Sequence, residues 1–205
     1  MKRSIGGLRL VQGRADVGRA RSRTLEPMWQ VTSSRIAYEN PWIQVVEDQV
    51  VGPDGAPGLY GVVELKHPAV FVVAVNERDE VLLATVDRHT VGPSLEIPAG
   101  GSDGEDLLAA AKRELYEETG YAAEHWQSIG SMDALNGVCR APEHVFLAQG
   151  LSRAAEGADA TAEGISGVAW VRWSDLMDMV AAGTITDGET LASLMYAAIA
   201  LHRGT

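Results

Sequence analysis

The sequence predicts an α/β fold in which a mixed sheet lies between helices. Short apolar runs rich in β-branched residues alternate with amphipathic segments, turn residues separate them, and no segment repeats. The chain has 205 residues, of which 46% are hydrophobic, enough for one full-sized domain with a small appendage. We therefore expect an α/β/α sandwich preceded by a small antiparallel sheet.

A β-rich segment near the N-terminus predicts that small sheet. β-branched residues fill positions 43–51, the turn sequence Gly-Pro-Asp-Gly follows at 52–55, and an apolar run resumes at 59–65. We assign residues 28–66 to this N-terminal unit and residues 67–205 to the main domain.

Six more apolar runs of the main domain have the length of strands. The polar sequence Asn-Glu-Arg-Asp at 76–79 joins the first two, which predicts a hairpin between them. The six runs are residues 69–75, 81–86, 95–97, 126–131, 143–148 and 168–173.

Capping residues and apolar periodicity predict three helices. The first has Asp103 as its N-cap and Gly120 just after its last turn. The last opens with a capping-box pattern, in which Thr186 precedes Glu189 by three residues. The three helices are residues 104–119, 174–182 and 189–202.

The charge of the chain is uneven. The whole sequence carries -11, yet residues 1–26 hold seven basic and two acidic side chains, so the tail carries +5 and the body -16. An acidic body repels the phosphates of nucleic acid, which argues against a nucleic-acid partner. No apolar run has the length of a membrane helix, and the single Cys139 fits a reducing compartment. We therefore expect a cytoplasmic protein without a membrane partner.

The basic residues 1–27 are expected to form a disordered tail. They lack the apolar core of a secretory signal, but their arginines also allow a transit peptide or a segment that binds an acidic partner. Met28 stands where the globular pattern begins, which allows a later translation start.

Three glutamates cluster on one side of the helix predicted at 104–119. At 100° per residue, Glu114, Glu117 and Glu118 fill an arc of about 100° beside an apolar stripe. Carboxylates so close repel one another unless a cation joins them, and oxygen-only ligands favour a hard ion such as Mg²⁺ or Mn²⁺. A solvated acidic helix face is the alternative explanation.

The segment around these glutamates resembles the Nudix box, G-x5-E-x7-R-E-U-x-E-E-x-G-U, in which U is aliphatic. The pattern places its first glycine at Ala99, whereas the chain has Gly100, and Tyr121 replaces the final aliphatic residue. The matching residues are Glu105, Arg113, Glu114, Leu115, Glu117, Glu118 and Gly120.

Two more segments resemble the ADP-ribose pyrophosphatase branch of the Nudix family, namely E-I-P-A-G at 96–100 and G-T-I-T-D-G-E-T at 183–190. The N-terminal β segment resembles the dimerisation sheet of that branch, which also helps to hold the adenosine half of the substrate. Residues 135–141 depart from the branch, because they keep only Gly137 of its S-P-G-F-[ST]-[DN]-E segment, with Glu143 two residues out of place.

The resemblance implies a Nudix-type α/β/α sandwich and a metal-dependent hydrolase. In this family the residues at Glu114, Glu117 and Glu118 hold divalent ions together with the backbone carbonyl of Ala99. Arg113 would orient the glutamates, and we count it and Glu117 among the catalytic residues.

The resemblance also implies a substrate site and a general base. Arg88 is similar to a family arginine that contacts phosphate. Glu96 begins the E-I-P-A-G segment, next to the residues expected to hold the metals. Trp42 is a candidate for stacking on adenine, with packing in a β-rich segment as the alternative. In this branch the base comes from an acidic loop, where the chain offers Glu163.

These features together predict a pyrophosphohydrolase that uses Mg²⁺ or Mn²⁺ and acts on a small nucleoside diphosphate derivative, as a homodimer. ADP-ribose, split into AMP and ribose 5-phosphate, is the first expectation. GDP-mannose or another nucleotide sugar is an alternative substrate. A Nudix-fold module that senses such a ligand without cutting it is an alternative of another class.

Overall fold

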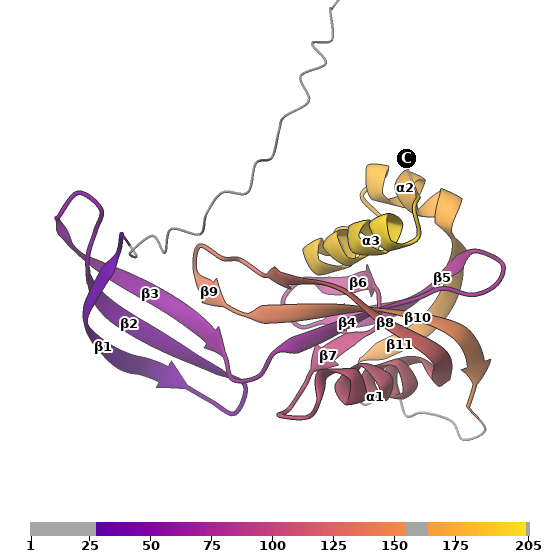
Figure 1. Ribbon diagram of the computed structural model, residues 1–205, viewed down its shortest axis with the longest axis horizontal. Coiled ribbons are helices and arrows are strands. Elements are labelled where there is room, and N and C mark those ends of the chain that lie inside the picture. Colours follow the sequence, from indigo (N-terminus) through magenta and orange to yellow (C-terminus); the bar gives the residue numbers. More distant parts are fainter. Residues whose placement is uncertain (1–27, 155–163, 204–205) are drawn as a thin grey trace, which may run out of the picture.

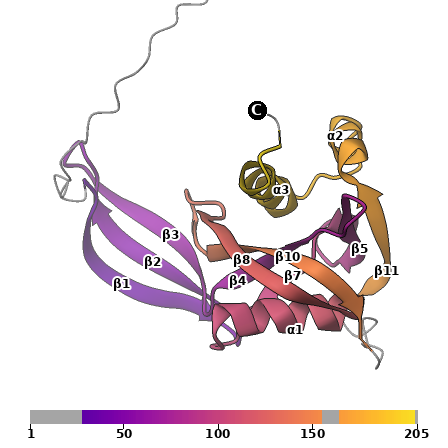
Figure 2. The ribbon, with the colours of Figure 1, turned by 45° about the vertical axis from the view of Figure 1, so that its right-hand side comes forward.

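The computed structural model describes residues 28–154 and 164–203, so the tail predicted at 1–27 and the candidate base Glu163 lie outside the described residues. Figures 1 and 2 show a curved N-terminal sheet beside a body in which strands lie between helices. The expected α/β class with a mixed sheet is confirmed by this arrangement.

The N-terminal sheet is an antiparallel meander of three strands, extended by a short strand from the body. Strand β1 (Gln30–Glu39) pairs with β2 (Ile43–Val51), and β2 pairs with β3 (Pro57–Leu65). Strand β9 (Cys139–Arg140) adds to the free edge of β3 in a parallel direction. The sheet is therefore tied to the body by backbone hydrogen bonds as well as by the chain itself.

Within the described residues, the body has seven strands in two sheets, of order β7-β4-β10-β8 and β11-β5-β6. Strands β4 and β10 run parallel while β8 and β10 run antiparallel, so the larger sheet is mixed. The strands are β4 (Ala69–Ala74), β5 (Glu80–Arg88), β6 (Gly92–Glu96), β7 (Ala99–Gly101), β8 (Tyr121–Asp133), β10 (Pro142–Arg153) and β11 (Ile165–Arg172).

The hairpin predicted between β4 and β5 is wrong except next to its turn. A single bridge joins Val75 to Val81, after which the two strands diverge into different sheets. The reason is that both edges of β4 are already occupied, one by β10 and the other by β7, so that β5 pairs with β6 and β11 instead.

Helix α1 (Leu107–Thr119) covers one face of the larger sheet (Figure 1). Val70 and Val72 point to this face because side chains alternate along a strand, and they pack against the buried Leu115 of the helix. Full burial of each such side chain stabilises the fold by about 1.5–3 kcal/mol. The apolar stripe of α1 is thus pressed onto the sheet, with its carboxylates at the flank.

The opposite face is covered by helices α2 (Trp173–Ala181) and α3 (Gly188–Ala200). Phe71 and Val73, which alternate with the residues under α1, pack here with Leu194 of α3. None of the three helices in the described part of the chain is long and apolar enough to cross a membrane.

The predicted start of α1 is wrong by three residues, and that of α3 differs by one residue. The N-cap of α1 is Asp106, whose side chain accepts hydrogen bonds from the second and third amides of the helix. Asp103 and Gly104 cannot begin a helix because their φ angles are +50° and +83°, which places them in a left-handed turn. In α3, Asp187 and Thr186 were both expected as caps; Asp187 is the cap, and it accepts a hydrogen bond from the Thr190 amide at 2.7 Å.

The contact between α3 and β8 depends on a glycine. A Cβ on Gly130 would overlap the ring of Tyr196, whose hydroxyl donates to the Ser131 carbonyl at 2.8 Å. We expect Gly130→Ala to lower the free energy of unfolding by about 1–3 kcal/mol, because the helix must shift to make room. Chemical denaturation measures this change. Gly61→Ala is the control, since open space surrounds that strand glycine; an equal loss in both variants would contradict the explanation.

Candidate active site

Helix α1 places two buried glutamates against the backbone of β7. Glu114 and Glu118 are only 4% and 5% exposed, and Glu118 Oε2 accepts a hydrogen bond from the Ala99 amide at 3.1 Å. A Cβ on Gly100 would overlap the carboxylate of Glu114, so the glycine allows this carboxylate to lie directly on the strand. The helix and the strand therefore meet through carboxylates and main chain rather than through apolar side chains.

Arg113 holds the outer part of this cluster together. Its guanidinium donates to Glu114 at 2.7 Å, to Glu117 at 2.9 Å, to Glu105 at 3.2 Å and to the Gly101 carbonyl at 2.8 Å. Burial lowers the pKa of Arg113, but these carboxylates outweigh burial and raise it above its ordinary value. Arg113 is thus a fixed positive charge that links β7 with three acids of the box.

A second ion pair joins the last residue of β5 to the last residue of β6, across the antiparallel pair of strands. Arg88 donates to Glu96 through Nε at 3.2 Å and through a terminal nitrogen at 2.5 Å, while Glu96 is 6% exposed. Hydrogen bonding to Glu96 raises the pKa of Arg88, and the charges of Glu118 and Asp187 act in the same direction. Arg88 therefore lies between helix α1 and the beginning of helix α3.

A pocket of about 410 Å³ opens beside this ion pair. Arg88 and Glu96 form one part of its wall, and the N-terminal turn of α3 forms another. The α3 turn is anchored to β6 because the buried Thr190 hydroxyl accepts a hydrogen bond from the Ile97 amide at 3.2 Å. The lining residues are Phe71, Arg88, Thr90, Val91, Ser94, Glu96, Glu143, Thr186, Asp187, Gly188 and Glu189.

Glu143 lines this pocket, and the sequence analysis assigned it no role beyond noting that it stands two residues from the family's acidic position. It begins the buried part of β10 and is 5% exposed, and among the described residues its Oε2 atom has no hydrogen-bond partner. Burial, followed by the charges of Glu189, Asp187 and Asp133, raises the pKa of Glu143 to about 7. A charged residue at the start of the apolar run 144–148 was the signal available in the sequence.

The neighbouring acids of α3 are more than helix caps. Burial raises the pKa of Glu189, and a hydrogen bond with Asp187 adds to the shift. Asp187 itself accepts a hydrogen bond from the Thr190 amide at 2.7 Å. Three carboxyl groups thus line the end of the pocket near α3.

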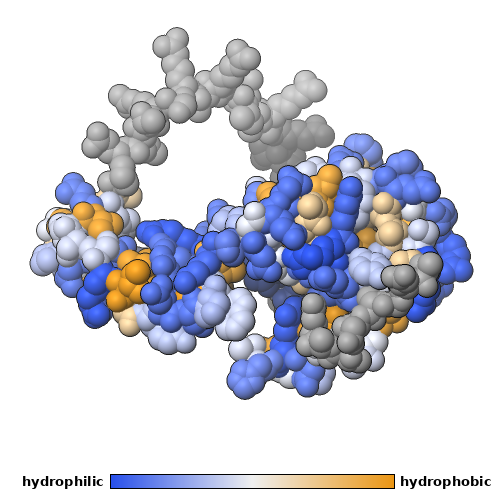
Figure 3. Space-filling view, turned by 90° about the horizontal axis from the view of Figure 1, so that it is seen from below, coloured by the Kyte–Doolittle hydropathy of each residue, from blue (hydrophilic) through white to orange (hydrophobic). Residues whose placement is uncertain are grey.

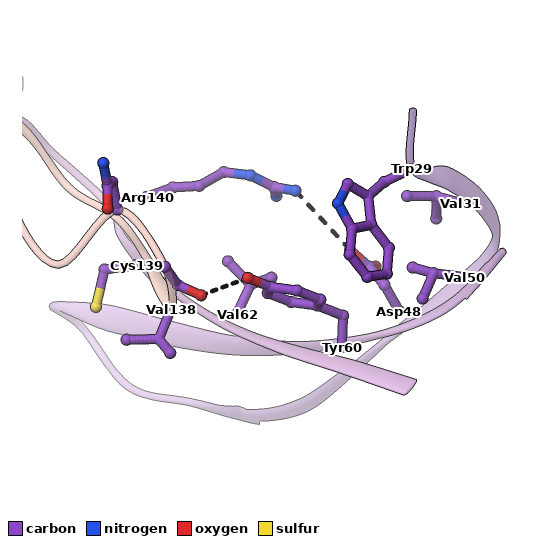
Figure 4. A pocket seen from close by; sticks show the side chains of 11 residues that line it. Trp29, Val31, Asp48, Val50, Tyr60, Val62, Val138, Cys139 and Arg140 are labelled. Carbon is purple, nitrogen blue, oxygen red and sulfur yellow. Dashed lines mark hydrogen bonds and ion pairs between the residues drawn. The ribbon is translucent and has the colours of Figure 1, made fainter. Parts of the chain in front are cut away.

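The N-terminal sheet holds a separate pocket of about 230 Å³ (Figure 4). Trp29 stands edge-on to Tyr60 with ring centroids 5.7 Å apart, and the Tyr60 hydroxyl donates to the Gly137 carbonyl. The buried Asp48 lies 3.8 Å from Arg140 of β9. This pocket is built by the sheet and by the segment before β10 that departs from the family pattern.

The structure does not bring every predicted site residue together. Trp42 is 71% exposed at the turn between β1 and β2 and is not among the residues that line either of these pockets. Arg88 and Glu96 share one pocket, and Glu114, Glu117 and Glu118 share the flank of α1.

The box residues fit a divalent cation in their chemistry. All side-chain donors are carboxylate oxygens, which hard ions such as Mg²⁺ prefer, and the absence of a side chain at Gly100 lets the Glu114 carboxylate lie directly on the backbone of β7. Within residues 28–154 and 164–203, no three acidic, histidine or cysteine side chains converge as metal ligands; Arg113 stands between two of the glutamates.

Comparison with models of protein families shows to which family the chain belongs. The NUDIX domain model matches residues 65–194, and the Nucleoside diphosphate sugar hydrolase N-terminal domain matches residues 29–63. The chain belongs to the Nudix family. The resemblance of residues 105–121 to the Nudix box is thereby confirmed, and Nudix hydrolases generally use divalent metal cations.

Individual Nudix relatives are similar over most of the chain. The ADP-ribose pyrophosphatase of Bacillus subtilis is 31% identical over 75% of this chain and 84% of its own length. The methanol dehydrogenase activator of Bacillus methanolicus is 27% identical over 82% and 88%. A crystal structure of an ADP compounds hydrolase has the same fold, with a TM-score of 0.74, 18% identity, and coverage of 85% of this chain and 94% of that one.

The raised pKa of Glu143 predicts a pH-dependent stability. A carboxyl group with a folded pKa of about 7 stabilises the fold fully below its ordinary value near 4.5, and this contribution is lost as the pH rises through 7. We expect Glu143→Gln, which cannot ionise, to gain stability relative to the wild type between pH 5 and pH 8.5, by up to about 2 kcal/mol. Thermal unfolding at both pH values measures the gain. A difference that is the same at both would contradict this pKa.

Proposed function

We propose that this Nudix hydrolase splits ADP-ribose into AMP and ribose 5-phosphate with the help of Mg²⁺. The observation that supports this most directly is the full set of box glutamates on α1, seated on the backbone of β7 next to a pocket that contains Arg88. The similarity to an ADP-ribose pyrophosphatase over most of both chains supports the choice of substrate.

In this proposal Glu114, Glu117 and Glu118 hold the divalent ions together with the Ala99 carbonyl. Bound ions supply neutralisation of the diphosphate and activation of a water molecule. Arg113 positions Glu114 and Glu117 by donating hydrogen bonds to both, and its positive charge holds the two carboxylates close together. Its role is structural order in the site rather than contact with substrate.

Substrate recognition in this proposal begins with Arg88. Its guanidinium donates to Glu96 and also lines the pocket, so that a phosphate oxygen can share the same cation. Glu96 keeps Arg88 in place. Glu163 remains our proposal for the general base, because it is the acidic residue that precedes β11 in the sequence.

Another nucleotide sugar, such as GDP-mannose, is the alternative substrate. The observation that favours keeping it is the departure of residues 135–141 from the family pattern, since this segment lines the pocket of the N-terminal sheet. A module that binds such a ligand without cutting it is the second alternative.

A hydrolysis screen over ADP-ribose, GDP-mannose, NADH and diadenosine polyphosphates tests the proposal. We expect Mg²⁺-dependent conversion of ADP-ribose to AMP and ribose 5-phosphate. Glu118→Gln should lower kcat by about 10²-fold or more, the scale of losing one main charge stabiliser, while the exposed Glu77→Gln keeps wild-type turnover. Binding without turnover of any substrate would establish the sensing module, and normal turnover of Glu118→Gln would refute the metal assignment.

We also propose that the N-terminal sheet joins two copies of the chain into a homodimer. Every residue of β1 is exposed, including Ile36 and Tyr38 at 55% each, and Figure 3 shows hydrophobic side chains on the surface of this sheet. Exposed apolar side chains gathered on one element are typical of an interface. In a dimer, Trp42 becomes available to stack on the adenine bound by the partner.

Sedimentation equilibrium tests the dimer. We expect the wild type to sediment as a dimer and Ile36→Glu to shift toward the monomer, because a charge on β1 would be buried in the interface. Ile199→Glu is the matched control, since Ile199 is 66% exposed on helix α3 and lies far from β1 in sequence and fold. A wild-type monomer, or an equal effect of both substitutions, would refute this interface.

A further inference from the structure

The pocket beside Arg88 has two chemically different ends. Arg88 contributes a positive charge at the end formed by β5 and β6. Glu143, Asp187 and Glu189 line the end formed by β10 and the first turn of α3. A ligand that fills this pocket therefore meets the Arg88–Glu96 ion pair contributed by β5 and β6, and carboxyl acceptors contributed by β10 and the start of α3.

Glu143 is held rigidly and lacks a partner. Its backbone lies in the middle of the sheet, paired with Ala69 of β4 on one side and with Met132 of β8 on the other. The side chain is 5% exposed and lines the pocket, yet within the described chain no donor reaches its Oε2 atom. A buried acceptor without a donor is costly, so such a group points to a ligand that supplies one.

The chemistry of this end selects the kind of donor. A second phosphate would be repelled by the three carboxyl groups, and an apolar group would leave Glu143 unpaired. A metal ion would also pair with carboxyl groups, but our proposal places the divalent ions at the box glutamates of α1, which leaves Glu143 for an uncharged donor. Hydroxyl groups donate hydrogen bonds and carry no charge, which matches carboxyl acceptors.

We propose that Glu143 is a specificity-determining residue that accepts hydrogen bonds from the hydroxyl groups of the sugar on the far side of the diphosphate. The proposal rests on the proposed function and extends it, because it names the group that the pocket demands there. Arg88 binds the phosphate of that sugar, and Asp187 and Glu189 flank its hydroxyl groups. The site therefore selects a neutral polyhydroxylated group over an alkyl group or a further phosphate.

The upward pKa shift of Glu143 agrees with this position. The carboxyl groups that produce the shift, after burial, are Glu189, Asp187 and Asp133, which places Glu143 with the α3 end of the pocket. A hydroxyl that donates to the charged form would bring this pKa down again on binding.

Two substrates that differ only in the distal group test the proposal. We expect wild-type enzyme to prefer ADP-ribose over the methyl ester of ADP, and Glu143→Gln to reduce that ratio of kcat/KM by about ten- to a hundredfold. Asp133→Asn is the matched control, since Asp133 is an exposed acid near Glu143 that does not line the pocket, and it should keep the wild-type ratio. Thermal unfolding verifies that each variant is folded.

If Glu143→Gln leaves the ratio of the two kcat/KM values unchanged, including by an equal loss with both substrates, the proposal is overturned while the proposed function stands. If the wild type hydrolyses neither substrate, the proposed function has failed, and calorimetric binding then decides about Glu143. Weaker binding of ribose 5-phosphate by Glu143→Gln, with unchanged binding of inorganic phosphate, supports the proposal. Equal affinity of wild type and variant for ribose 5-phosphate overturns it.

Discussion

The close approach of helix α1 to the backbone of strand β7 is the contact on which the whole site depends. Two glutamates are buried in this contact, one lying over Gly100 and the other bonded to the Ala99 amide. Buried carboxylates are costly unless their charge is compensated, so an apolar contact would have been the more stable choice. In our proposal these carboxylates are kept because they hold the divalent ions.

Two arginines compensate these charges in different ways. Arg113 belongs to the helix itself and ties three glutamates to the Gly101 carbonyl, so it maintains the order of the cluster. Arg88 comes from β5 and faces a pocket, which leaves its guanidinium accessible to a phosphate. In our proposal, an anionic substrate approaches the acidic body, which has a net charge of -16, at the accessible guanidinium of Arg88.

The divergence of β4 and β5 creates the space that the pocket beside Arg88 occupies. Because β5 leaves β4 after a single bridge, the end of the β5–β6 pair stands apart from the start of β10, and the pocket lies between them. Helix α3 closes this space, and its first turn is fastened to β6 through Thr190. Glu143, at the start of β10, is thereby presented to the same pocket as Arg88 from the other side.

The sequence by itself determined the features that depend on neighbours along the chain. Helical spacing brings Glu114, Glu117 and Glu118 to one flank, and β-branched runs mark most strands, so the cluster and the layered fold were predictable. The family was predicted from the resemblance of residues 105–121 to the Nudix box. The cap of α1 was misplaced because a left-handed turn at Asp103 competes with helix, which propensities alone do not reveal. Only the tertiary structure decided the partners of β4 and the convergence of Glu143 with α3. These contacts join segments more than about 25 residues apart, and their pairing depends on competition among all the strand edges.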